Sequence, residues 1–181
     1  MLKRINLPQD PSSEENIQKW INDLGSLIGS ERLKARLTLI RTGAKAVPAL
    51  ITTLSNGNQK ARWEAARALT IVKDSSAASA LVRALEDEDH DVRWASMKAL
   101  IALERTGLEA LLQALMMDFA SVWLREGAHH VLNVLKKKRQ LRQPSLQVLQ
   151  ALEGVEPEVA VPWAAQAAWE TLYRLGKEQW K

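Results

Sequence analysis

The chain has 181 residues, 46% of them apolar, which is enough to bury a hydrophobic core and excludes a chain that is disordered by composition. Cysteine is absent, and this excludes disulfides, thiolate metal sites and a cysteine nucleophile. The formal net charge is +4, but without the five positive charges between residues 136 and 142 it becomes −1. With no signal-peptide pattern and no apolar run of about 18 residues, we expect a cytoplasmic protein without a membrane span.

Two apolar patterns alternate along the chain. The first has the i, i+3, i+4, i+7 spacing of an amphipathic helix, as in Ile17, Ile21 and Leu24. The second follows the frame Arg-x-x-Ala-x-x-x-Leu, with serine in place of alanine in the third copy and no arginine in the fifth. Its first four copies begin at Arg32, Arg62, Arg93 and Arg125. No segment alternates as a half-buried strand would, so the sequence predicts an all-α protein of about five helical hairpins.

The hairpins follow one another with a nearly constant period. Turn-forming stretches such as "SNGN" and "EDEDHD" separate the two patterns within a repeat. A helical pair of about 30 residues cannot bury its apolar face alone, so we expect the pairs to stack as one α-solenoid domain over residues 1–181. The repeats are placed at 14–42, 44–73, 75–105, 107–135 and 144–176, with a basic insertion at 136–143.

Two segments carry a resemblance to a known family. "AVPALITTLSNGNQKARWEAARAL" and "ASALVRALEDEDHDVRWASMKAL" resemble HEAT repeats, and their short period is similar to the phycobilisome-lyase (PBS lyase) HEAT-like type. The resemblance covers roughly residues 15–175 and implies a right-handed superhelix whose second helices line a concave, partner-binding face. The fourth and fifth repeats depart from the pattern, in the turn "MDFAS" and in the missing arginine.

A helical wheel, at 100° per residue, places the candidate binding residues. In the third repeat Trp94, Lys98 and Ile101 lie opposite the core-facing arc. The corresponding positions of the other repeats extend this face into one groove, which we expect to hold a partner protein or peptide. Its proposed lining is Leu33, Leu37, Trp63, Arg67, Trp94, Lys98, Ile101, Glu126, His130 and Tyr173. In the alternative interpretation, the two groove tryptophans pack on neighbouring repeats and stabilise the stack.

The repeated arginines are interpreted as structural. The HEAT resemblance implies that Arg32, Arg62, Arg93 and Arg125 bond to acidic turn residues of their own or the next repeat. The candidate acceptors are Asp89 and Asp118.

A second candidate site is the basic cluster in "KKKRQLR". Its cations are Lys136, Lys137, Lys138, Arg139 and Arg142. Such a run is typical of a solvated connector, and the alternative is weak contact with nucleic acid or an acidic partner.

Catalytic and metal motifs are missing from the sequence. The three histidines do not form an i, i+4 metal pair, and there is no Gly-rich phosphate loop or G-x-S-x-G motif, so we expect neither a metal nor a cofactor. The sequence therefore favours a non-enzymatic scaffold or adaptor. Two alternatives stay open: a phycobilin lyase or chaperone-like subunit that binds a tetrapyrrole or phycobiliprotein, and a nucleic-acid-binding protein without glycosylase chemistry.

Overall fold

The computed structural model describes residues 13–118 and 120–178, and all regular elements in these ranges are helices. The α-helices form five consecutive pairs: α1 (Glu14–Asp23) and α2 (Gly29–Thr42), α3 (Val47–Asn56) and α4 (Gln59–Val72), α5 (Ala78–Arg83) and α6 (His90–Ala102), α7 (Arg105–Met117) and α8 (Val122–Lys137), α9 (Ser145–Leu152) and α10 (Pro157–Glu178). Short 3₁₀ turns at Gly43–Ala46 and Ser75–Ala77 lead into α3 and α5, and another at Ala84–Glu86 follows α5.

Side-chain caps determine where most of the second helices begin. The Asn58 side chain accepts a hydrogen bond from the Ala61 backbone N–H at the start of α4. Ser121 does the same for α8, and Asp89 accepts two such bonds at the start of α6. These caps satisfy backbone donors that have no partner within the helix, and they turn the chain sharply between the two helices of a pair.

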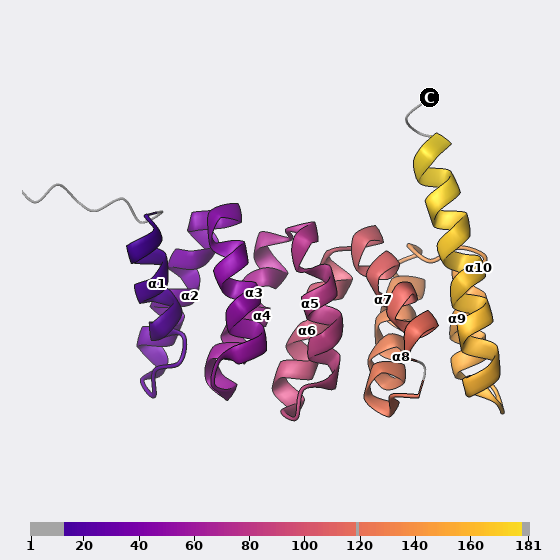
Figure 1. Cartoon of the computed structure of the whole chain (residues 1–181), viewed down its shortest axis with the longest axis horizontal. Coiled ribbons are helices and arrows are strands. Elements are labelled where there is room, and N and C mark those ends of the chain that lie inside the picture. The colour runs from indigo at the N-terminus through magenta and orange to yellow at the C-terminus, as the bar shows by residue number, and fades with distance from the viewer. Residues whose placement is uncertain (1–12, 119, 179–181) are drawn as a thin grey trace, which may run out of the picture.

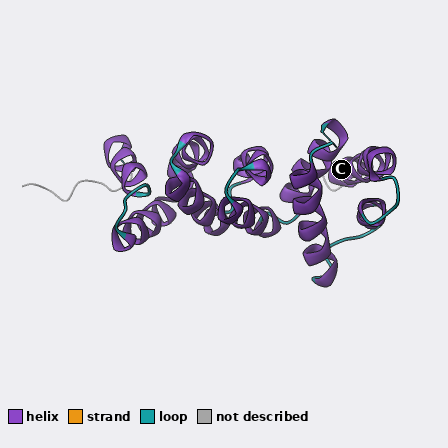
Figure 2. Ribbon diagram, turned by 90° about the horizontal axis from the view of Figure 1, so that it is seen from below, coloured by secondary structure: helices purple, strands orange, loops and turns teal. Residues whose placement is uncertain are grey.

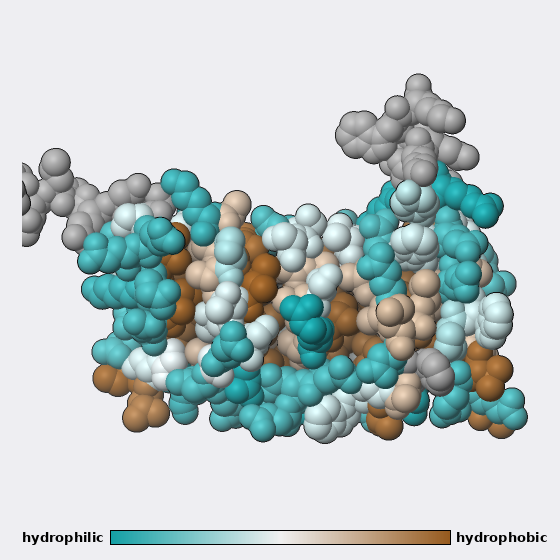
Figure 3. Space-filling model, in the orientation of Figure 1, coloured by the Kyte–Doolittle hydropathy of each residue, from teal (hydrophilic) through white to brown (hydrophobic). Residues whose placement is uncertain are grey.

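The first four pairs stack in two rows (Figures 1 and 2). One row contains α1, α3, α5 and α7, and the other contains α2, α4, α6 and α8. The core between the rows is aliphatic, with twelve fully buried leucines: Leu24, Leu39, Leu50, Leu69, Leu81, Leu85, Leu100, Leu111, Leu112, Leu115, Leu132 and Leu135. The face of the first row is mainly hydrophilic on its crests, and apolar side chains appear in the furrows between helices (Figure 3). The α-solenoid predicted from the repeats is therefore confirmed.

The last pair enters the stack with its helices exchanged. Helix α9 packs against α8, while α10 packs against α7 and so extends the row of first helices (Figure 2). The Arg105 guanidinium donates to the Leu172 carbonyl at 2.7 Å, which joins the start of α7 to α10. Two features fit this exchange: the buried Leu141 anchors the connector after α8, and the buried small side chains of Ala165 and Ala168 permit close packing of α10.

Candidate functional site

A groove crosses the second-row helices α2, α4 and α6. It encloses about 550 Å³, and we call it the central groove. Its lining combines apolar side chains, two indoles and three cations: Arg36, Leu37, Ile40, Trp63, Arg67, Thr70, Ile71, Asp91, Trp94, Ala95 and Lys98. Four of these residues, Arg36, Ile71, Asp91 and Ala95, lie outside the positions that the helical wheel placed on this face.

The groove continues into an apolar hollow on α2. This hollow has a volume of about 460 Å³ and shares Leu37 and Ile40 with the central groove. Leu33 completes its apolar surface, and Leu33 and Leu37 are 45% and 49% exposed. Large aliphatic side chains of a helix normally face the core, so two of them exposed one turn apart form an apolar surface that no other part of the described chain covers.

Each groove tryptophan is covered by a cation four residues later on the same helix. The Arg67 guanidinium lies 4.3 Å from the Trp63 ring centroid, and the Lys98 ammonium lies 5.4 Å from that of Trp94. The two indoles differ in burial, because Trp63 packs partly into the core whereas Trp94 is 38% exposed. Only Trp94 therefore presents the open indole surface expected of both.

Beneath the groove lies a buried carboxylate that the sequence pattern did not single out. Glu64 on α4 is 3% exposed and accepts hydrogen bonds from Arg36 of α2 and, at 3.3 Å, from Arg67. The Arg32 Nε also lies 3.8 Å from Glu64. Glu64 is the one acidic residue of α4, beside Lys60, Arg62 and Arg67, and this lone acid in a basic helix was the available signal.

The charges around Glu64 shift the titration of Arg67. Burial lowers the pKa of the Arg67 guanidinium, repulsion from Arg36 lowers the pKa further, and attraction to Glu64 opposes both effects. One carboxylate thus faces three guanidiniums, and the groove retains an excess of positive charge.

The central groove is not lined by Ile101, Tyr173 or Glu126, although all three were proposed as groove residues. Ile101 is 8% exposed and belongs to the core, because the C-terminal end of α6 is covered by its neighbours. Tyr173 stacks on Trp169 at 5.3 Å on α10, and the exchange of the last pair takes it out of the second row. Glu126 is an exposed side chain of α8 outside the groove lining.

His130 on α8 bounds the exposed indole of Trp94. The two ring centroids are 4.7 Å apart with a tilt of 55°. Burial lowers the pKa of His130, and the charges of His129 and Lys137 lower it further. A neutral imidazole is therefore favoured against the indole at neutral pH.

The repeated arginines share one local contact. Each donates to the carbonyl five residues earlier, so each guanidinium holds the turn before its own helix. These donor–acceptor pairs are Arg32 with Leu27, Arg62 with Gly57, Arg93 with Glu88 and Arg125 with Ala120. The fourth position of each second helix is where a long side chain can reach back over the preceding turn.

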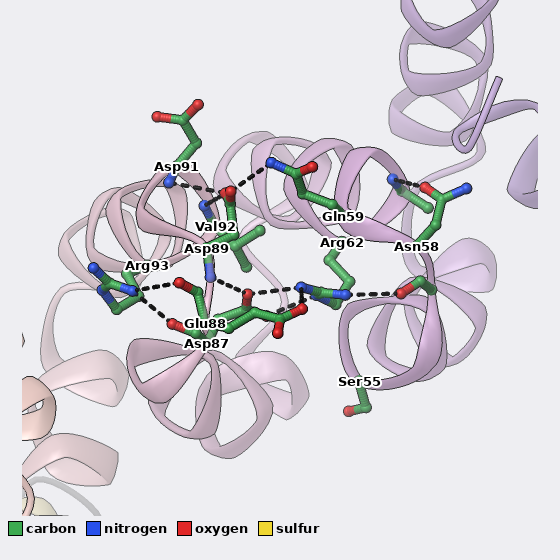
Figure 4. A network of polar contacts seen from close by, with 12 residues as sticks. Ser55, Asn58, Gln59, Arg62, Asp87, Glu88, Asp89, Asp91, Val92 and Arg93 are labelled. Atoms are coloured by element: carbon green, nitrogen blue, oxygen red, sulfur yellow. Dashed lines mark hydrogen bonds and ion pairs between the residues drawn. The ribbon is translucent and has the colours of Figure 1, made fainter. Parts of the chain in front are cut away.

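Where these arginines contact the next repeat, their partners are not the expected Asp89 and Asp118. Arg62 binds Asp87 through two hydrogen bonds of 2.7 and 2.9 Å and reaches Glu88 at 3.1 Å (Figure 4). The Asp87 hydrogen bond raises the pKa of Arg62. Arg93 lies over the Trp123 ring at 4.5 Å, and Arg125 approaches Glu158 at 3.8 Å.

The two expected acceptors, Asp89 and Asp118, do not pair with these arginines. Asp89 caps α6 and accepts from Gln59, so its oxygens are already engaged (Figure 4). Asp118 is exposed at the end of α7. The proposal of these two aspartates as arginine partners was wrong, because the first caps α6 and the second lies exposed after the last turn of α7.

The basic cluster surrounds the end of α8. Its five cations Lys136, Lys137, Lys138, Arg139 and Arg142 are exposed, while Leu141 between them is buried. The first two lie in the last turn of α8, where positive charge is favourable for the helix dipole. The segment is thus partly helical and anchored rather than a free connector.

Metal-binding geometry is missing from the described part of the chain. Among residues 13–118 and 120–178, no three histidine, aspartate or glutamate side chains gather in a way that could hold a metal ion. Within the same ranges, no helix combines the length and the apolar character needed to cross a membrane.

The stacked helical pairs define an α-solenoid, and comparison with protein families places the chain within that class. The model of HEAT repeats matches residues 18–101 and, in an overlapping register, residues 47–133. These matches span more than half of the chain, which therefore belongs to the HEAT-repeat family. They end before the basic cluster and the exchanged last pair. A search of the curated proteins finds no match to the chain.

Proposed function

We propose that the chain is a non-enzymatic interaction module that binds a partner protein in the central groove and the adjoining hollow. The observation that carries this proposal is the exposed apolar surface of Leu33 and Leu37 beside the half-open indole of Trp94. Monomeric proteins rarely leave such a surface uncovered, and aromatic and arginine side chains are the usual anchors of protein interfaces.

A protein partner fits the groove better than nucleic acid does. Nucleic acid binding would use the indole faces as stacking platforms, but Arg67 and Lys98 lie over the Trp63 and Trp94 rings. The aliphatic hollow of Leu33 and Leu37 offers no stacking surface. Apolar side chains of a polypeptide match this hollow directly.

The test is affinity capture from the source organism with paired variants. Leu33→Ser combined with Leu37→Ser should remove a specific partner, because it removes the apolar surface while leaving the core intact. Val155→Ser combined with Val159→Ser removes an even more exposed apolar pair around the start of α10 and should retain the partner. Retention by the first variant, with circular dichroism showing that both variants are folded, would reject the proposal.

A tetrapyrrole-binding role, as in PBS lyase proteins, is the second candidate. The observation that favours it is the combination of indoles, aliphatic side chains and unpaired positive charge in one groove, which suits an apolar ring system with propionates. Added biliverdin should then change its absorption spectrum and quench tryptophan fluorescence. A spectrum that is the same with wild type and with Trp94→Ala would exclude groove binding of the tetrapyrrole.

A further inference from the structure

We propose that the central groove selects an acidic peptide segment with apolar side chains, and that a carboxylate of this segment binds between Arg67 and Lys98. This inference rests on the proposed function and specifies the chemistry of the partner. It follows from three properties of the groove: its charge, its apolar floor and its width.

The charge of the groove is positive and incompletely paired. Of the lining residues Arg36, Arg67 and Lys98 are cationic, and Asp91 is the acidic member. Both oxygens of Glu64, which lies beneath them, are already approached by Arg67, and one of them also accepts from Arg36. No further carboxylate of the described residues lies within ion-pair distance of these three cations.

Of the three cations, Lys98 is the least completely paired. Its ammonium lies over the Trp94 ring, and no side-chain carboxylate of the described residues pairs with it. It occupies the same register on α6 as Arg67 does on α4, each four residues after a groove tryptophan. Two neighbouring helices therefore present one cation each toward the same space. A ligand carboxylate there would reduce the repulsion among the guanidiniums around Glu64.

The apolar floor requires more than a small anion. Leu37 and Ile40 of α2 and the exposed Ile71 of α4 line the same groove as the cations. A free phosphate or acetate would leave this surface in water. A peptide that places aliphatic or aromatic side chains on it and an acidic side chain on the cations would cover both parts.

The width of the groove sets the length of the segment. Neighbouring packed helices lie about 8–10 Å apart, so the path from α2 across α4 to α6 is about 20 Å. An extended peptide covers this distance with about six residues, at about 3.3 Å each, and a helical one with about 13 residues. A linear segment of roughly 15 residues is therefore a sufficient probe.

The test uses three fluorescein-labelled 15-residue peptides with the same leucine positions. Their remaining positions are glutamate in the first peptide, glutamine in the second and lysine in the third. Anisotropy titrations with the full chain, in a buffer of moderate ionic strength, should give binding of the glutamate peptide at least about tenfold tighter than of the glutamine peptide, and no binding of the lysine peptide.

Two charge-reversal variants locate the site. Lys98→Glu should weaken binding of the glutamate peptide about tenfold, because attraction is replaced by repulsion. Arg83→Glu reverses an exposed charge on α5 in the other row and should change the affinity by less than about twofold. Equal effects of the two variants would overturn the inference, since they would indicate a non-specific response to net charge.

The remaining outcomes separate this inference from the proposed function. If the glutamine peptide binds as tightly as the glutamate peptide, or if no peptide binds while the capture experiment retains a partner through Leu33 and Leu37, the acidic specificity is wrong and the interaction module stands. If a 20-nucleotide oligothymidylate binds in a Lys98-dependent manner and no peptide does, both proposals fail.

Discussion

At the scale of single residues, the groove depends on a carboxylate that is almost fully buried. Glu64 holds Arg36 of α2 and Arg67 of α4, so it connects two repeats as well as neutralising their charge. Removing one partner of a buried ion pair leaves the others unpaired in a poorly solvated place. The same residue therefore serves stability and the positive character of the groove.

Glu64→Gln is expected to lower the free energy of unfolding by about 3 kcal/mol, because three guanidiniums lose their shared carboxylate. Urea denaturation followed by circular dichroism measures the loss. Glu126→Gln, at an exposed position of α8, is the matched control and should change the free energy by less than about 0.5 kcal/mol. Equal stability of the two variants would contradict the assigned role of Glu64.

The two groove tryptophans should respond differently to truncation. Trp63 packs partly into the core, so Trp63→Ala is expected to cost about 2–3 kcal/mol of unfolding free energy. Trp94 is 38% exposed, and Trp94→Ala should cost about 1 kcal/mol while weakening partner binding. Parallel thermal denaturation and binding measurements distinguish the effects. A larger stability loss for Trp94→Ala would mean that its indole is a packing residue.

His130 makes stability depend on pH. Its pKa is lowered in the folded state, so the unfolded chain takes up the proton more readily as the pH falls below the ordinary histidine pKa of 6.5. The stabilisation that this lowered pKa contributes is therefore fully present above that pH. It is lost as the pH falls toward the pKa of His130 in the folded state. The melting temperature should fall from pH 7 to pH 5.5, and His130→Gln should reduce this fall. The same reduction for His90→Gln, at the exposed first residue of α6, would argue against His130 as the cause.

At the scale of the elements, the acidic turn before α6 has two roles: Asp89 caps the helix, whereas Asp87 and Glu88 pair with Arg62. Asp89 accepts from the Asp91 and Val92 backbone N–H groups at 3.0 and 3.1 Å, whereas Asp118 follows the last turn of α7 and is exposed. Two aspartates that occupy similar turns in the sequence thus have different structural roles.

Asp89→Ala is expected to lower the free energy of unfolding by about 1–2 kcal/mol, since α6 loses its cap. Asp118→Ala should change it by less than about 0.5 kcal/mol. Chemical denaturation of the two single variants makes the comparison, and a comparable loss in both would show that the Asp118 carboxylate also holds its turn.

At the scale of the whole molecule, stability should decline toward the C-terminal end. Helices α4 and α6 have a stacked pair on both sides, whereas α9 and α10 have one on a single side among the described residues. In a solenoid, stability comes largely from these interfaces between neighbouring repeats. The exchanged last pair therefore has fewer partners than the central pairs.

Native-state hydrogen exchange should show this gradient directly. Amides of α10 should exchange faster than those of α4 and α6, because the terminal pair can open without disturbing the centre. Mass spectrometry of peptic fragments resolves the helices. Slower exchange in α10 than in α6 would contradict the expected order.

The paired helices and their stacking can be predicted from the sequence alone. Apolar spacing at 3.6 residues, the arginine frame and turn-forming stretches such as "SNGN" and "EDEDHD" specify the paired helices and their stacking, because each depends on neighbours within one or two turns. The periodicity also identifies α2, α4 and α6 as the helices that present Leu37, Trp63 and Trp94 to one face.

Only the tertiary structure showed how residues of different repeats contact and bury one another. The burial of Ile101, the convergence of Arg36 and Arg67 on Glu64 and the exchange that takes Tyr173 out of the second row all join residues that are distant in sequence. A helical wheel gives direction about one helix axis, but it contains no information on the depth to which a neighbouring helix covers that side. Burial, charge pairing and the order of the helices in the last pair depend on how the helices pack. The positive and apolar groove could therefore be described only from the tertiary structure.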